Sequence, residues 1–106
     1  MDIEYIKQEF AAISDHNQWD KLHTPKNLAT AISIHSAQIQ KQFQWLENDE
    51  SSLMVRGPDK KEALTSEVAN VLIYLVAFCD KMDIQLETAV IDKLAWNRQR
   101  FLHGKN

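Results

Sequence analysis

Residues 32–45 read "ISIHSAQIQKQFQW", and their apolar side chains recur at the spacing of one helix face. His35, Gln38 and Gln42 fall inside this face, and Lys41 lies at its edge. The stretch therefore predicts an amphipathic helix that turns polar groups as well as apolar groups towards the core. On a helical wheel the apolar stripe is made by Leu28, Ala31, Ile32, Ile39, Phe43, Trp45 and Leu46.

A second helical pattern, over about residues 59–82, has the same mixture of apolar and polar positions. Glu67 and Tyr74 fall inside its apolar stripe, and Asn70 lies at the border. Because a buried polar group without a partner costs about 1–3 kcal/mol, we expect the polar groups of the two helices to meet or to line a cavity. A hydrogen-bond cluster that fixes helix register would explain the pattern, and so would a ligand site.

The remaining patterns predict two further helices and an all-α fold. Residues 2–15 form a one-sided helix with Asp2 as N-cap, Thr24 and Pro25 begin the helix that runs to about residue 46, and residues 86–101 form the last helix. The chain has only 2 Gly and 2 Pro. We therefore expect one domain over residues 1–106, folded as an antiparallel four-helix bundle with an exposed loop around Leu53.

Composition bears on partners and location. The net charge of −3 disfavours a nucleic-acid backbone as the main partner. The single cysteine, Cys79, lies in the apolar run of residues 71–79, which predicts a buried thiol in a reducing compartment. That run is far shorter than the roughly 20 residues of a membrane span, and the first residues carry acids and no apolar signal region. These features predict a cytoplasmic protein that binds neither membrane nor nucleic acid.

The helix over residues 59–82 also predicts self-association. It is apolar around most of its circumference between Val71 and Phe78. A helix that is apolar all round must be buried on all sides, and the four helices of one chain leave one of its faces open. We therefore expect a homodimer that can pair further into a tetramer.

Four short motifs resemble the MazG-like all-α nucleoside triphosphate pyrophosphohydrolases, particularly their dCTP-pyrophosphatase-like branch. They are the W-x3-H-T-P-x-N-L pattern of residues 19–28, F-Q-W at 43–45, V-L-I-Y-L at 71–75 and K-L-A-W-N at 93–97. The resemblance covers about residues 10–101 and implies hydrolysis of a nucleoside triphosphate to a monophosphate and pyrophosphate. In the family, the helix motifs E-x-x-E and E-x-x-D hold Mg²⁺, a hard cation that prefers oxygen ligands.

This chain departs from the family at those metal positions. His35 and Gln38 stand for the first motif, Glu67 and Asn70 for the second, so one carboxylate remains of four. Lys41 adds a positive charge where the family often has another Glu. Glu67 is the one candidate catalytic residue, and binding of Mg²⁺ is in doubt because imidazole suits Zn²⁺, Ni²⁺ or Cu²⁺ better.

This chain matches the family better at the positions that bind substrate than at the positions that bind metal. The resemblance implies that residues around the base and sugar, and residues near the phosphates, are present in this chain. From composition alone, ordinary core or interface packing explains Trp19 and Trp45 equally well. A solvated helix face explains Lys93 and Asn97. The first group comprises Trp19, His23, Trp45 and Tyr74, and the second comprises Lys93 and Asn97.

Three hypotheses remain open from the sequence. The first is a nucleotide binder with weak or no hydrolysis. The second is an active pyrophosphohydrolase with an altered metal set, which draws acids from a partner subunit or from "ENDE" at residues 47–50. The third is a helical interaction protein whose pocket has lost its ligand.

Overall fold

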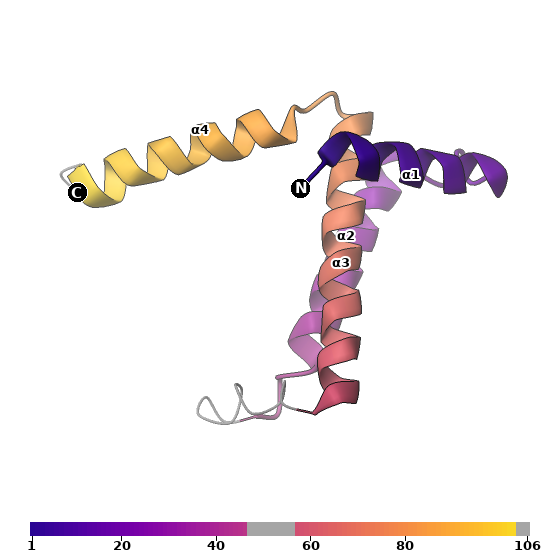
Figure 1. The fold of residues 1–106 in the computed structure, drawn as a ribbon, viewed down its shortest axis with the longest axis horizontal. Helices are drawn as coiled ribbons and strands as arrows, with labels where there is room; N and C mark the ends of the chain where they lie inside the picture. Colours follow the sequence, from indigo (N-terminus) through magenta and orange to yellow (C-terminus); the bar gives the residue numbers. More distant parts are fainter. Residues whose placement is uncertain (47–56, 104–106) are drawn as a thin grey trace.

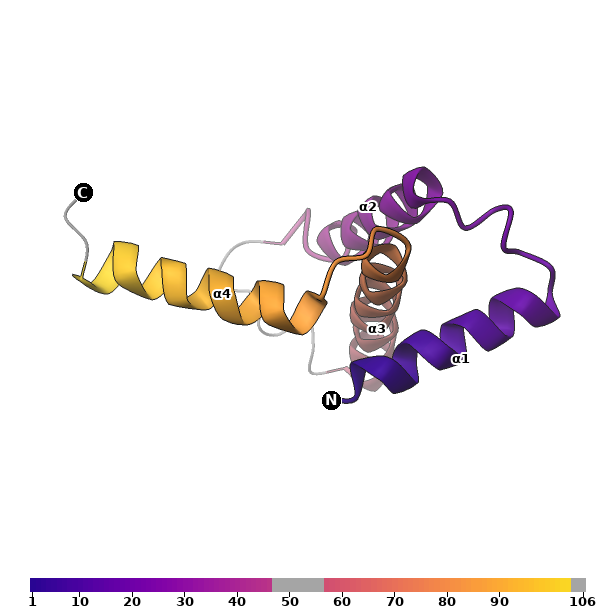
Figure 2. The ribbon, with the colours of Figure 1, turned by 90° about the horizontal axis from the view of Figure 1, so that it is seen from above.

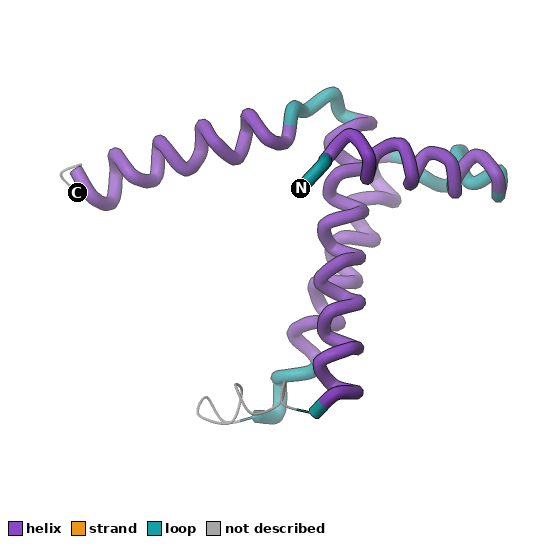
Figure 3. The backbone as a smooth tube through the Cα atoms, viewed as in Figure 1, coloured by secondary structure: helices purple, strands orange, loops and turns teal. Residues whose placement is uncertain are grey.

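The computed structural model describes residues 1–46 and 57–103, and every regular element in these ranges is helical (Figures 1 and 3). The all-α class with four helices is thus confirmed. The loop expected around Leu53 and the "ENDE" acids lie outside the described residues. The elements are α1 (Ile3–His16), α2 (Pro25–Lys41), α3 (Pro58–Lys81), α4 (Leu86–Arg98) and a π-helical turn, η2 (Gln99–His103), which continues α4.

Two of the helices begin at the residues that the sequence predicts. The Asp2 side chain accepts a hydrogen bond of 3.1 Å from the backbone N–H of Tyr5, and Thr24 accepts one of 3.2 Å from Asn27. These bonds satisfy N–H groups that have no partner inside the helix. Regular α2 ends earlier than predicted, because turns with i to i+3 hydrogen bonds replace the α-helical pattern after Lys41 and carry the chain to Leu46.

α2 and α3 form the main helix pair, running in opposite directions, and α1 lies across the C-terminal half of α3 (Figures 1 and 2). Leu28 of α2 and Val76 of α3 are the most buried large side chains, at 1% and 2% exposure. Ala77 and Cys79 are buried beside them. The buried cysteine thiol predicted from the sequence is therefore confirmed, and burial raises its pKa above the ordinary value.

α4 projects away from the body formed by the other three helices (Figure 2). In the described part of the chain it packs extensively only against η2, and no residue of α4 is buried. The radius of gyration is 17.0 Å, whereas a compact domain of this length has about 13 Å. A single chain therefore forms a three-helix body with an extended arm, and the fourth member of the predicted bundle does not close on it.

α3 is the one described helix that is long and apolar enough, by length and composition, to cross a membrane. The uninterrupted apolar run of residues 71–79 alone is too short, but the whole helix has 24 residues. A central helix of an all-α body meets the same criterion. α3 packs against α1 and α2 and carries the polar side chains of Glu67 and Asn70 near its middle.

Candidate functional site

A polar cluster lies where the middle of α2 faces the middle of α3. Nδ1 of His35 lies 2.9 Å from Oε2 of Glu67, and the side-chain amide of Asn70 donates a hydrogen bond of 3.3 Å to Oε1 of the same carboxylate. With Glu67 ionised, the imidazole N–H is the donor of the first bond. Both oxygens of Glu67 are thus engaged, and the polar groups of the two helices meet as expected.

Tyr74 extends this cluster along α3. Its ring stacks on the His35 imidazole, with centroids 5.3 Å apart and planes 13° from parallel. Phe10 of α1 contacts the same tyrosine ring edge-on, with centroids 5.7 Å apart and planes at 74°. The stacking fixes the plane of the imidazole, so Tyr74 and Glu67 together determine how His35 is presented.

The aromatic contacts continue from Phe10 to the connection between α1 and α2. His23 lies 4.8 Å from Phe10 and 6.1 Å from Trp19, measured between ring centroids. Its Nδ1 is 3.0 Å from Oγ of Ser14, which is only 5% exposed. Sequence reasoning missed Ser14 and Phe10 here: both lie in the helix predicted over residues 2–15, where Phe10 is an apolar residue suited to packing, and no spacing pattern marks Ser14.

Three predicted ligand residues lie apart from this assembly within one chain. Trp45 follows the end of α2 and is 88% exposed. Lys93 and Asn97 lie on the projecting α4, and the Lys93 ammonium sits 3.8 Å from the centre of the Trp96 ring. One copy of the chain therefore gathers Trp19, His23, Tyr74 and the polar cluster, but not the complete predicted set.

A groove of about 790 Å³ opens beside the polar cluster, between the C-terminal part of α2 and the N-terminal part of α3. Gln38 belongs to this groove, and Glu67 connects it to the cluster. Sequence reasoning missed its α3 residues other than Glu67, although Lys60 and Ala63 lie seven and four positions before Glu67 and so share its helix face. The lining residues are Gln38, Lys41, Gln42, Leu46, Asp59, Lys60, Ala63, Ser66 and Glu67.

The motif resemblance predicts the metal positions at His35, Gln38, Glu67 and Asn70, and the chemistry of this cluster can be compared with the needs of Mg²⁺. They offer one carboxylate, and hydrogen bonds from His35 and Asn70 already engage both of its oxygens. Across residues 1–46 and 57–103, no group of three or more His, Cys, Asp or Glu side chains is arranged to hold a metal ion. A hard divalent cation depends on several oxygen ligands, most of them charged, and this cluster does not supply them.

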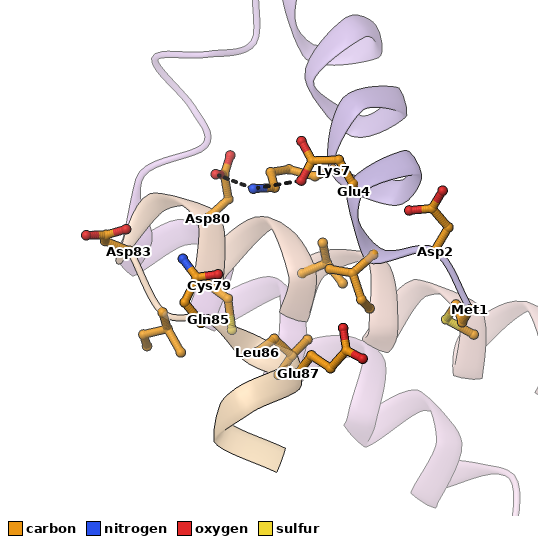
Figure 4. A pocket seen from close by; sticks show the side chains of 13 residues that line it. Met1, Asp2, Glu4, Lys7, Cys79, Asp80, Asp83, Gln85, Leu86 and Glu87 are labelled. Carbon is orange, nitrogen blue, oxygen red and sulfur yellow. Dashed lines mark ion pairs between the residues drawn. The ribbon is translucent and has the colours of Figure 1, made fainter. Parts of the chain in front are cut away.

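A separate cavity of about 310 Å³ lies where the start of α1 meets the end of α3 and the start of α4 (Figure 4). Four of its charged side chains already have structural roles. Asp2 caps α1, and the Lys7 ammonium lies 3.3 Å from Glu4 and 3.6 Å from Asp80, contacts that raise the lysine pKa. This cavity is thus a joint between helices.

Known proteins resemble the chain over most of its length. dCTP pyrophosphatase 1 of Mus musculus is 37% identical over 100 residues, and that of Homo sapiens is 35% identical. Each match covers 94% of this chain but 57% of the relative, so the chain spans little more than half of these curated proteins. No model of a known protein family matches the chain.

A solved structure covers nearly all of both molecules. A pyrophosphatase from Archaeoglobus fulgidus superposes with a TM-score of 0.85 at 35% identity, over 92% of this chain and 90% of that one. The sequence and the fold thus agree with the resemblance found in the motifs. The chain belongs to the MazG-like all-α nucleoside triphosphate pyrophosphohydrolase family, on its dCTP-pyrophosphatase-like branch.

Proposed function

We propose that this member of the nucleotide pyrophosphohydrolase family binds a nucleotide and hydrolyses triphosphates weakly or not at all. One observation carries the proposal: both oxygens of Glu67 are engaged by His35 and Asn70, at the positions where the motif resemblance predicts the Mg²⁺ ligands. Without that cation, Glu67 repels a triphosphate, and phosphoryl transfer loses its main source of charge stabilisation.

The aromatic assembly supports binding of the nucleoside part. Trp19 is 42% exposed, and its contact with His23 leaves indole surface open to a ligand. Stacking of a base on an aromatic side chain contributes about 1–3 kcal/mol and needs no metal. Nucleosides and monophosphates should therefore bind better than triphosphates. Because the relatives are named dCTP pyrophosphatases, a pyrimidine nucleotide is the first ligand to test.

A second copy of the chain is part of this proposal. Ile91 and Leu94 of α4 are 59% and 62% exposed, a large apolar surface for a protein that is free in water. If α4 packs against a partner copy, Lys93 and Asn97 can approach a ligand that Tyr74 of the other copy contacts. We accordingly propose a single domain over residues 1–106 that forms a homodimer or tetramer in the cytoplasm.

The competing function is an active pyrophosphohydrolase with an altered metal set. The names of the relatives favour it, and the oxygens of Gln38 and Asn70 can ligate a cation although they add no charge. Activity would then require Glu67 to leave His35. A helical interaction protein without a ligand is the remaining alternative.

A panel of pyrimidine and purine nucleosides, monophosphates and triphosphates, with Mg²⁺ or Mn²⁺, separates these functions. We expect thermal stabilisation by nucleosides or monophosphates, loss of that stabilisation in Trp19→Ala, and little release of pyrophosphate. Robust release that disappears in Glu67→Gln, but not in the exposed control Glu62→Gln, would establish the active enzyme. No stabilisation by any nucleotide would favour the interaction protein.

A further inference from the structure

We propose that the groove between α2 and α3 binds the phosphate of a nucleoside monophosphate without a metal ion, through the ammonium groups of Lys41 and Lys60. The inference rests on the proposed function in one respect, that the ligand is a nucleotide. It adds the place of the phosphate, the residues that hold it and its independence from divalent cations.

The first support is the arrangement of the groove. Gln38 and Lys41 are three residues apart on α2, and Lys60 and Glu67 are seven residues apart on α3, so each pair lies on one helix face. Both faces line the same groove of about 790 Å³. The two lysines therefore enter one space from opposite helices, and Glu67 lies at the end that joins the polar cluster.

The second support is the balance of charge in this space. In the described part of the chain, Lys7 and Lys81 are engaged in ion pairs, whereas Lys41 and Lys60 are not. Two carboxylates also line the groove, but Glu67 already accepts hydrogen bonds from His35 and Asn70. Among the described lining residues, Asp59 is then the one carboxylate opposite two lysines, so this part of the groove suits a phosphate better than it suits a metal cation.

The neutral residues that line the groove also favour a phosphate over a metal cation. The amide groups of Gln38 and Gln42 and the hydroxyl group of Ser66 each carry a hydrogen-bond donor, which phosphate oxygens accept. Mg²⁺ instead requires acceptor oxygens, mostly charged ones, in octahedral geometry. A family site in which carboxylates hold a metal, and the metal holds phosphate, becomes here a site in which side chains reach the phosphate directly.

The test compares matched ligand pairs by calorimetry in EDTA: deoxycytidine with dCMP, and deoxyadenosine with dAMP. At least one monophosphate should bind about tenfold more tightly than its nucleoside, and added Mg²⁺ should change neither affinity by more than about twofold. Lys41→Glu should abolish the advantage of the phosphate and leave nucleoside affinity unchanged, and Lys60→Ala should reduce it. The control is Lys26→Glu, an equal charge change at an exposed position of α2 outside the groove.

Each other outcome overturns the inference in a distinct way. If nucleosides bind as tightly as monophosphates, or if the phosphate advantage requires Mg²⁺, the metal-free phosphate site is wrong while nucleotide binding stands. If Lys26→Glu and Lys41→Glu reduce the affinity advantage of the monophosphate equally, net charge and not a specific site causes that advantage. If no nucleoside or nucleotide binds, the proposed function fails together with the inference. Inorganic phosphate, titrated alone, should bind far more weakly than the monophosphate.

Discussion

The α2–α3 interface and the projecting α4 differ in which side chains they bury and which they expose. At the interface, polar side chains are drawn inside and paired, as the contacts of Glu67 with His35 and Asn70 show. On α4, apolar side chains face outward, and Leu94 is 62% exposed whereas Val76 of α3 is 2% exposed. The polar groups of the interface are therefore paired within one chain, whereas α4 presents an apolar surface that its own chain leaves exposed.

The largest effect is expected on the α4 side of this comparison. The double variant Ile91→Asp, Leu94→Asp should convert a dimer or tetramer into monomers. Burial of each such side chain contributes about 1.5–3 kcal/mol, so the dissociation constant should rise more than about 100-fold. Sedimentation at micromolar concentration measures this, with Asp92→Asn as a control on the same helix. A wild-type protein that is already monomeric would contradict the expectation.

A set of substitutions should convert the paired interface into a metal site. His35→Glu, Gln38→Glu and Asn70→Asp together restore the family carboxylates beside Glu67. Calorimetry should show Mg²⁺ affinity raised by about tenfold or more, because the hard cation gains charged oxygen ligands. The metal-free form should melt at a lower temperature, since like charges then repel at close range. Tight binding of Mg²⁺ by the wild type without nucleotide would show that the hydrogen bonds of Glu67 do not prevent metal binding.

Glu67 tests how much the paired cluster stabilises the fold. Glu67→Ala removes the partner of both His35 and Asn70, and should lower the free energy of unfolding by about 1–3 kcal/mol. The matched change at the exposed Glu62 should stay within about 0.5 kcal/mol. Urea denaturation of the two variants provides the comparison, and equal losses would show that the pairing seen at the interface does not stabilise it.

Ser14 tests the aromatic end of the assembly. Ser14→Ala removes the buried hydroxyl that lies 3.0 Å from Nδ1 of His23, and should cost about 1 kcal/mol in stability. The histidine should also lose its preferred tautomer, which imidazole ¹⁵N shifts report. The exposed control Ser33→Ala should change neither quantity. An unchanged His23 spectrum in Ser14→Ala would mean that ring contacts alone hold the imidazole.

The smallest effect concerns Cys79, in the core of the three-helix body. Burial raises the pKa of its thiol above the ordinary value, so the folded protein holds this proton more tightly than the unfolded chain. The resulting stability is complete below the pKa of the unfolded thiol and is lost as the pH rises through the folded pKa. The midpoint of alkylation rate against pH should be higher in buffer than in urea, and equal midpoints would contradict the assignment.

Periodicity was enough to predict much of the fold. The helix beginnings at Asp2 and Thr24 follow from side chains that cap locally, and the meeting of His35 with Glu67 follows from two stripes that must face each other. The outward course of α4 could not be predicted, because its exposed apolar residues give the same pattern as a helix buried in its own chain. Local spacing reports which face is apolar and not which molecule covers it.

The candidate site was predictable only in part for a related reason. The family motifs locate Tyr74 and Glu67, but the contact of Ser14 with His23 depends on the course of the connection between α1 and α2. Lys60 and Ser66 become visible as groove residues only once α2 lies beside α3. Sequence motifs thus identify the residues that match the family's site, whereas the other residues around the site are identified only from tertiary packing.

The most direct measurement is a crystal structure of the protein soaked with Mg²⁺ and a nucleoside triphosphate. We predict that Nδ1 of His35 remains bonded to Glu67 and that no metal ion lies between residues 35 and 67. A Mg²⁺ ion coordinated by Glu67 and by phosphate oxygens would contradict this account and establish the protein as a working metal-dependent pyrophosphohydrolase.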